Sequence, residues 1–206
     1  MSVGTTIDVL RATPAAQARV GETLARAFRD DPVLTWITPD PDLRRERLPS
    51  LFAAETEAYL RLEETYLVDD GAGAALWAPP GTRAVSDDDA DLYGERIATI
   101  FQEGFDRVVH VMERMEEHHP DRPCYYLQWM GVVPEHRGRG LGSRLLTSML
   151  ARCDAIDQPA YLEATSPANR RLYGRHGFET VAAIALPAGP TLWPMWREPH
   201  AATGSH

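Results

Sequence analysis

The sequence predicts an α/β (α+β) protein in which helices flank a mixed β-sheet. Three observations support this class. Segments with apolar residues at helical spacing alternate with short strand-like runs, and hairpin signals occur near both ends of the chain. Residues 124–133, CYYLQWMGVV, form a nearly continuous apolar run, as expected of a central strand covered on both faces. This alternation of elements favours packed layers of sheet and helix.

The first two elements are a strand and a helix. Residues 5–12, TTIDVLRA, are expected to form the strand, and residues 13–31 the helix, with Thr13 as its cap and Pro14 at its first position. The helix should end near RDDP, because the residue before Pro32 is biased away from the helical conformation.

A Pro- and Asp-rich turn and a second helical run follow, and then a hairpin. The run extends from about residue 43 to 64, and Pro49 either kinks it or begins it. Residues 65–81 contain two apolar runs around DDGAG, which indicates two antiparallel strands. One side of the helical run carries Leu48, Leu51, Phe52, Glu55 and Tyr59.

Residues 86–119 have helical spacing throughout and are expected to form one or two helices, with Gly94 and Gly104 as weak points. After the central strand, the sequence predicts a helix over about 140–156, a strand at 160–165, a short helix at 167–177, and two terminal strands near 178–187 and 191–198.

Composition limits the classes of function. The formal net charge of -9 and the pI of about 5.2 argue against a nucleic-acid-binding surface, which needs clustered basic residues. No stretch approaches 18 uninterrupted apolar residues and the N-terminus lacks an export signal, so we expect a cytoplasmic protein with no membrane partner. Cys124 and Cys153 have no metal-ligand spacing and are expected to be reduced and buried. We expect a single domain over residues 1–200, followed by a polar tail at 201–206.

The stretch GVVPEHRGRGLGSRLL, residues 131–146, joins the central strand to the following helix. Its glycines allow several backbone N–H groups to gather at a helix N-terminus, which is a site for phosphate or pyrophosphate. It is not a dinucleotide fingerprint, because Ser143 or Leu145 stands where the third glycine is required. It is not a P-loop either, because it contains no lysine.

The pattern Arg137-x-x-Gly140-x-Gly142 resembles the R/Q-x-x-G-x-G/A signature of the GNAT superfamily of acyl-CoA-dependent N-acetyltransferases. Two further matches extend the resemblance. The turn is preceded by a strand ending in GVVP, and a later segment matches the family pattern N-x-x-x-Y-x-x-x-G-F with Asn169, Tyr173, Gly177 and Phe178. The resemblance implies a GNAT fold, a strongly twisted mixed sheet flanked by helices.

Longer segments are similar, in order and spacing, to those of the puromycin-acetylating members of the superfamily. Residues 86–119 show little detailed match, and this region helps to shape the acceptor pocket in the family. The similar segments are AFRDDPVLTWITPD, YLVDDGAGAALWAPPG, HHPDRPCYYLQWMGVVPEHRGRGLGS, YLEATSPANRRLYGRHGFE and LPAGPTLWPMWRE.

The resemblance implies acetyl-CoA as co-substrate. The backbone amides of residues 137–143 would hold its pyrophosphate, and the strand at 128–133 would pair with its pantetheine arm. Arg137 and Arg139 would reach a phosphate, unless either side chain is simply solvated, and Asn169 either binds the cofactor or caps a helix. The implied cofactor-binding residues are Gly131, Val132, Val133, Arg137, Gly138, Arg139, Gly140, Leu141, Gly142, Ser143, Asn169 and Tyr173.

The resemblance also implies catalytic roles. Tyr173 would be the general acid that protonates the departing CoA sulfur. Glu163, on the strand beside the expected catalytic gap, is a candidate general base that would remove the proton of the amine. Two alternatives stay open, namely that Glu163 is a structural carboxylate and that water relayed by main-chain carbonyls removes the proton.

Asp30, Asp31 and Trp36 resemble an acceptor-side loop, in which acidic and aromatic groups would hold a cationic substrate. A helix-ending turn with one buried Trp is the other interpretation. The expected partner is a small-molecule amine acceptor, such as an amine drug or metabolite, and the expected assembly is a monomer or a homodimer. A protein acetyltransferase and a non-catalytic acyl-CoA-binding module are the alternative functions.

Overall fold

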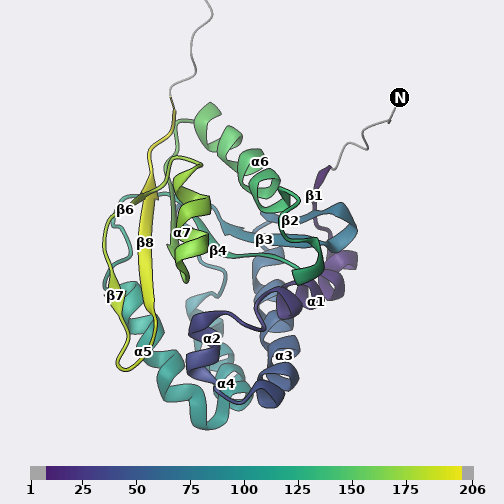
Figure 1. The fold of residues 1–206 in the computed structure, drawn as a ribbon, viewed down its shortest axis with the longest axis vertical. Helices are drawn as coiled ribbons and strands as arrows, with labels where there is room; N and C mark the ends of the chain where they lie inside the picture. The colour runs from purple at the N-terminus through teal and green to yellow at the C-terminus, as the bar shows by residue number, and fades with distance from the viewer. Residues whose placement is uncertain (1–7, 201–206) are drawn as a thin grey trace, which may run out of the picture.

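The computed structural model describes residues 8–200, in which an eight-stranded sheet is packed against helices (Figure 1). The strands are β1 Val9–Arg11, β2 Thr65–Val68, β3 Gly73–Ala78, β4 Tyr125–Val132, β5 Ala160–Ala164, β6 Glu179–Thr180, β7 Ile184–Ala185 and β8 Thr191–Arg197. The α-helices are α1 Gln17–Ala27, α2 Pro32–Ile37, α3 Pro41–Leu60, α4 Ala90–Phe101, α5 Phe105–Glu116, α6 Leu141–Ala155 and α7 Pro167–Gly174.

The sheet has the order β1-β2-β3-β4-β5-β8-β6, and β7 pairs with β8. Its pairs are antiparallel except for β4 and β5, which are parallel. Helix α6 provides the crossover that a parallel pair requires. The mixed sheet flanked by helices that the sequence predicts is therefore confirmed.

Two apolar cores lie on opposite faces of the sheet, as the alternation along β3 shows. Leu76 faces a core that includes Leu24 and Phe52, and Trp77 faces a core that includes Leu146. The first core packs α1–α5 and the second packs α6 and α7, so β4 is covered on both faces. In Figure 1, α2, α3 and α4 gather at the lower end of the view and α6 lies at the upper end.

The N-terminal elements differ from the prediction in two places. The predicted strand, residues 5–12, begins outside the described residues, and within its described part Val9–Arg11 form β1. Helix α1 ends at Ala27, earlier than predicted, and residues 32–37 form α2 where a turn was expected. Asp31 causes this difference, because its Oδ1 accepts hydrogen bonds from the N–H groups of Val33 and Leu34 and so begins a new helix.

The remaining helices follow the predicted pattern with shifted boundaries. Pro49 lies inside α3 and does not begin it. Residues 86–119 form two helices, α4 and α5, joined by a 3₁₀ turn at Gln102–Gly104. Gly104 lies at this break, whereas Gly94 is an ordinary residue of α4, so only one of the two predicted weak points interrupts the helix.

Cys124 and Cys153 are both free and buried, as predicted. Between residues 8 and 200, no helix combines the length and the apolar character needed to cross a membrane. The same residues contain no cluster of three histidine, cysteine or acidic side chains arranged to hold a metal ion.

Candidate active site

Strands β4 and β5 diverge in the middle of the sheet. They pair only from Tyr125 with Ala160 to Leu127 with Leu162. Beyond that point β4 continues to pair with β3, and β5 continues to pair with β8. Residues 128–132 of β4 therefore have no strand partner on the β5 side, where an extended ligand with amide groups could add to the sheet.

The glycine-rich turn follows β4 and leads into α6. Gly138 and Gly140 have φ angles of 76° and 78°, a left-handed conformation that glycine adopts without strain. Gly140 is the N-cap of α6 and has no side chain to cap the N–H groups of the first turn, and among the described residues no side chain accepts from Leu141, Gly142 or Ser143 N–H. Apart from the glycine and its chain neighbours, no heavy atom of residues 8–200 lies within 4 Å of the position that a Cβ of Gly138 or Gly140 would take, so the backbone borders open space. These properties suit an anionic group such as a pyrophosphate.

The guanidinium of Arg137 is engaged by the protein itself. It donates hydrogen bonds to the carbonyl oxygens of Val132, at 3.2 Å, and Ala27, at 2.8 Å. Arg137 thereby ties the turn to β4 and to the end of α1. The side chain therefore shapes the turn, and its contact with a phosphate stays a prediction.

Other side chains border the turn. The guanidinium of Arg139 is half-exposed, lies 2.7 Å from His136 Nδ1 and is 3.4 Å from Asp69 Oδ2. It is thus neither fully solvated nor buried, and it is available to a ligand at the turn. On the α6 side, His176 Nε2 lies 3.0 Å from Ser143 Oγ, which connects the start of α6 to the loop after α7.

Helix α7 carries Asn169 and Tyr173. Ser166 Oγ accepts a hydrogen bond of 3.1 Å from the Asn169 N–H, so Ser166 is the cap and Asn169 is not. Tyr173 is 6% exposed, and its hydroxyl has no hydrogen-bond partner among the described residues. Burial, and then the charge of Asp31, raises the pKa of Tyr173. Its phenol is therefore neutral and carries its proton, although the raised pKa makes it a weaker acid than a solvated tyrosine.

Glu163 lies on β5, just beyond the point of divergence. Its Oε2 accepts a hydrogen bond of 2.9 Å from the hydroxyl of Tyr126, while its Oε1 is inaccessible to solvent and has no partner among the described residues. Burial raises the pKa of Glu163 to about 7, and the hydrogen bond from Tyr126 limits the rise. A carboxylate with this pKa can take up and release a proton near neutral pH.

Glu163 and Asp31 line a cavity of about 630 Å³ between the sheet and helices α2–α5. Aromatic and aliphatic side chains dominate its wall, and residues of α4 and α5 contribute to it. Tyr173 is not among the lining residues, although Asp31 acts on its pKa. The representative apolar lining residues are Tyr59, Phe101, Val108, Met112, Tyr126 and Trp129.

The three predicted acceptor residues have different positions. Asp31 is buried at the cavity wall, whereas Asp30 is exposed. Trp36 does not line the cavity. Its ring lies 5.3 Å from the Arg107 guanidinium, and it packs so closely on Gly189 that a Cβ there would come within 2.6 Å of its Nε1. The structure therefore gives Trp36 a packing position, and its acceptor-binding role stays a prediction.

Glu55 was not assigned a role from the sequence. It lies on α3, is 9% exposed and lines the same cavity. The sequence does contain a signal for Glu55, because an acidic residue on the apolar side of a helix is buried only where partners compensate for its loss of water.

Comparisons with known proteins agree with this geometry. Residues 89–180 match the family model described as "Acetyltransferase (GNAT) domain". The chain is 27% identical over 187 residues to an uncharacterized N-acetyltransferase of Schizosaccharomyces pombe, which covers 82% of this chain and 72% of that protein.

Solved structures show the same fold. A protein of Corynebacterium glutamicum described as "histone acetyltransferase HPA2 and related acetyltransferase" is 29% identical, with a TM-score of 0.70 over 96% of this chain and 99% of that chain. Arylalkylamine N-acetyltransferase 2 from Aedes aegypti is 18% identical, with a TM-score of 0.66 over 94% of this chain and 99% of that chain, and this likeness concerns the fold alone.

Proposed function

We propose that this chain, an acyltransferase with a GNAT acetyltransferase domain, transfers the acetyl group of acetyl-CoA directly to the amine of a small, largely apolar molecule. The observation that carries the proposal is the position of Glu163. Its carboxylate, with a pKa of about 7, lies beside the open edge of β4 and lines an apolar cavity of about 630 Å³.

The donor would be held mainly by backbone groups. The uncapped N–H groups at the start of α6 would bind the pyrophosphate, with Arg139 beside them. The unpaired edge of β4 at residues 128–132 would bind the amides of the pantetheine arm. Gly131 lets this edge lie close to α1, because a Cβ at this position would come within 2.5 Å of Ala27 Cβ.

Glu163 would accept the proton that the amine must lose before it reacts. An amine with a pKa near 10 is only about one part in a thousand neutral at pH 7, so this step is needed. The amine nitrogen then forms a bond to the thioester carbonyl carbon, the carbon–sulfur bond breaks, and the nitrogen releases its second proton to solvent. Tyr173, a neutral buried phenol, would donate its proton to the departing thiolate and regain one from solvent.

The cavity favours a small-molecule acceptor. It lies between the sheet and α2–α5 and is lined largely by apolar side chains, as expected for a small-molecule site. Proteins of the same fold include one described as a polyamine N-acetyltransferase of Drosophila melanogaster, as well as the arylalkylamine enzyme of Aedes aegypti. We include puromycin-like amine antibiotics among the proposed acceptors, which would give the enzyme a role in antibiotic resistance inside the cell.

The test is release of free thiol from acetyl-CoA with a panel of amines: puromycin, an arylalkylamine, alkyl amines and a lysine peptide. We expect at least one small amine to be acetylated, and Tyr173→Phe to lower kcat by about 100-fold. Tyr66→Phe is the matched control, because its hydroxyl binds Glu64, away from the cavity.

Two results would contradict the proposal. Turnover of the lysine peptide alone would indicate a protein acetyltransferase, and the 206-residue chain contains no lysine of its own that would add a background signal. Acetyl-CoA binding without turnover of any amine would indicate a binding module.

A further inference from the structure

Glu55 is a buried carboxylate on the wall of the acceptor cavity. Its Oε1 accepts a hydrogen bond of 2.5 Å from the Tyr93 hydroxyl, and its Oε2 accepts one of 2.9 Å from Trp129 Nε1. Both donors are neutral. The carboxylate therefore has hydrogen-bond partners but no opposite charge, an arrangement that is costly for an ionised group out of water.

The cations around the cavity do not supply this charge. Arg83 and Arg122 line its mouth, but both are exposed, and they pair with Asp87 and Glu198. His119 also lines the cavity, and burial lowers its pKa, which favours the neutral ring. Within the described residues, no arginine or histidine forms an ion pair with Glu55.

The surroundings of Glu55 suit an ammonium group. Tyr59, Tyr93 and Trp129 line the cavity with it, and aromatic faces attract cations in a water-poor site. Burial, and then the charges of Glu55 and Glu163, raise the pKa of Tyr59, so this phenol lies within the electrostatic range of both carboxylates. The two acids therefore belong to one continuous cavity.

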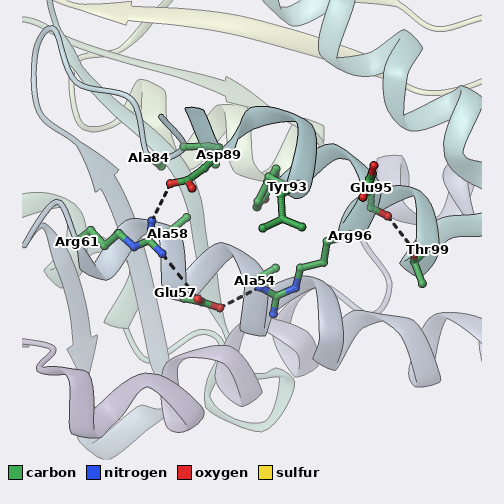
Figure 2. Close-up of a pocket in the computed structure, with 12 residues that line it drawn as sticks. Ala54, Glu57, Ala58, Arg61, Ala84, Asp89, Tyr93, Glu95, Arg96 and Thr99 are labelled. Atoms are coloured by element: carbon green, nitrogen blue, oxygen red, sulfur yellow. Dashed lines mark hydrogen bonds and ion pairs between the residues drawn. The ribbon is translucent and has the colours of Figure 1, made fainter. Parts of the chain in front are cut away.

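A second pocket, at the surface between α3 and α4, has a different character (Figure 2). Its volume is about 450 Å³, and four of its five charged side chains form ion pairs with one another. Arg61 lies 3.8 Å from Glu57 and 3.3 Å from Asp89, and Arg96 lies 2.9 Å from Glu57. Tyr93 lines both pockets, so it forms part of the wall between this neutralised outer pocket and Glu55.

We propose that Glu55 binds a second cationic group of the acceptor, so that the preferred substrate has an amine at one end, an apolar middle and a cation at the other end. This inference rests on the proposed function and names its substrate class. The reacting amine lies at Glu163, and the second cation lies among Tyr59, Tyr93 and Trp129.

The test compares two probes of equal length, octane-1,8-diamine and octylamine, by calorimetric titration of the full chain. We expect the diamine to bind at least about 10-fold more tightly, because a charge-assisted hydrogen bond forms in a site that excludes water. Glu55→Gln keeps the shape and the acceptor oxygen of the side chain but removes its charge, and it should abolish the preference. Glu57→Gln, on the same helix but in the outer pocket, should leave the preference unchanged.

Equal affinities for the two probes in the unmodified chain would overturn the inference, whatever the variant does. A preference that survives in a folded Glu55→Gln variant would overturn it as well, and so would the failure of both probes to bind.

Thiol release separates this inference from the proposed function. If octylamine is acetylated but the diamine binds no more tightly than octylamine, the proposed role of Glu55 is wrong and the proposed reaction stands. If the diamine binds through Glu55 but no amine is acetylated, the binding site stands and the proposed reaction fails.

Discussion

Asp31 Oδ2 accepts a hydrogen bond of 2.5 Å from Thr165 Oγ1, a contact between residues 134 positions apart. Thr165 follows the last residue of β5, and Asp31 is the N-cap of α2. One carboxylate therefore begins the helix on one side of the cavity and holds the end of the strand that carries Glu163.

Asp31→Ala should lower both stability and activity. The variant loses the cap of α2 and leaves the Thr165 hydroxyl without its partner, so we expect a loss of about 2 kcal/mol or more in the free energy of unfolding. Asp40→Ala is the matched control, because Asp40 caps α3 through two similar hydrogen bonds but is exposed and has no distant partner. Chemical denaturation and kcat should separate the variants, and equal values in both assays would contradict a positioning role for Asp31.

The rate should depend on the protonation of Glu163. Because burial raises its pKa to about 7, kcat/KM should rise with pH through that value and then level off. Tyr126→Phe removes a hydrogen bond that favours the ionised carboxylate, so the rise should move to higher pH. A pH–rate profile that is the same in Glu163→Gln as in the unmodified enzyme would exclude Glu163 as the base.

Ionisation of Glu163 should destabilise the fold as pH rises, whereas ionisation of most acids in folded proteins stabilises it. Its folded pKa of about 7 lies above the usual value of 4.5, so its favourable contribution is complete below pH about 4.5 and is lost as pH rises through about 7. Glu163→Gln cannot ionise, and we expect it to be more stable than the unmodified chain at pH 8, by at most about 3 kcal/mol. Thermal melts at pH 8 and pH 5 should show this difference shrinking at the lower pH. A constant difference would count against a raised pKa.

Gly140→Ala should weaken acetyl-CoA binding. The φ of 78° is unfavourable for alanine by about 1 kcal/mol or more, and a shift of the turn would misalign the first N–H groups of α6. We expect an increase in the Kd for acetyl-CoA of about 10-fold by calorimetry. Gly94→Ala, in an open position inside α4, is the control and should stabilise the protein slightly without changing the Kd.

The elements that the sequence predicts well are those with strong local signals. The hairpin around DDGAG, the apolar strand β4 and the glycine turn before α6 each depend on residues that are adjacent in the chain. Helix α2 was missed because its six residues have too little periodicity to stand out, and its start depends on the conformation of Asp31.

The candidate site could be predicted only in part, for a physical reason. The glycines that shape a turn leave a pattern in the sequence, whereas an arginine side chain can bind either a ligand or its own backbone. Arg137 binds backbone: its guanidinium donates to the carbonyl oxygens of Val132 and of Ala27, and Ala27 lies 110 residues away in the chain. The surroundings of Trp36 and Glu55 likewise depend on residues far away in the chain. Trp36 packs on Gly189. Glu55 accepts hydrogen bonds from Tyr93 and Trp129.

The divergence of β4 and β5 separates two kinds of surface. On the donor side, the groups offered to a ligand are mainly backbone N–H and C=O groups, which most substitutions leave unchanged. On the acceptor side, the wall is made of side chains from α2–α5, each of which a single codon change can replace. If the proposed function holds, new acceptor preferences can therefore arise by mutation, or be engineered, in α3, α4 and α5 while the half proposed to bind the thioester stays unchanged.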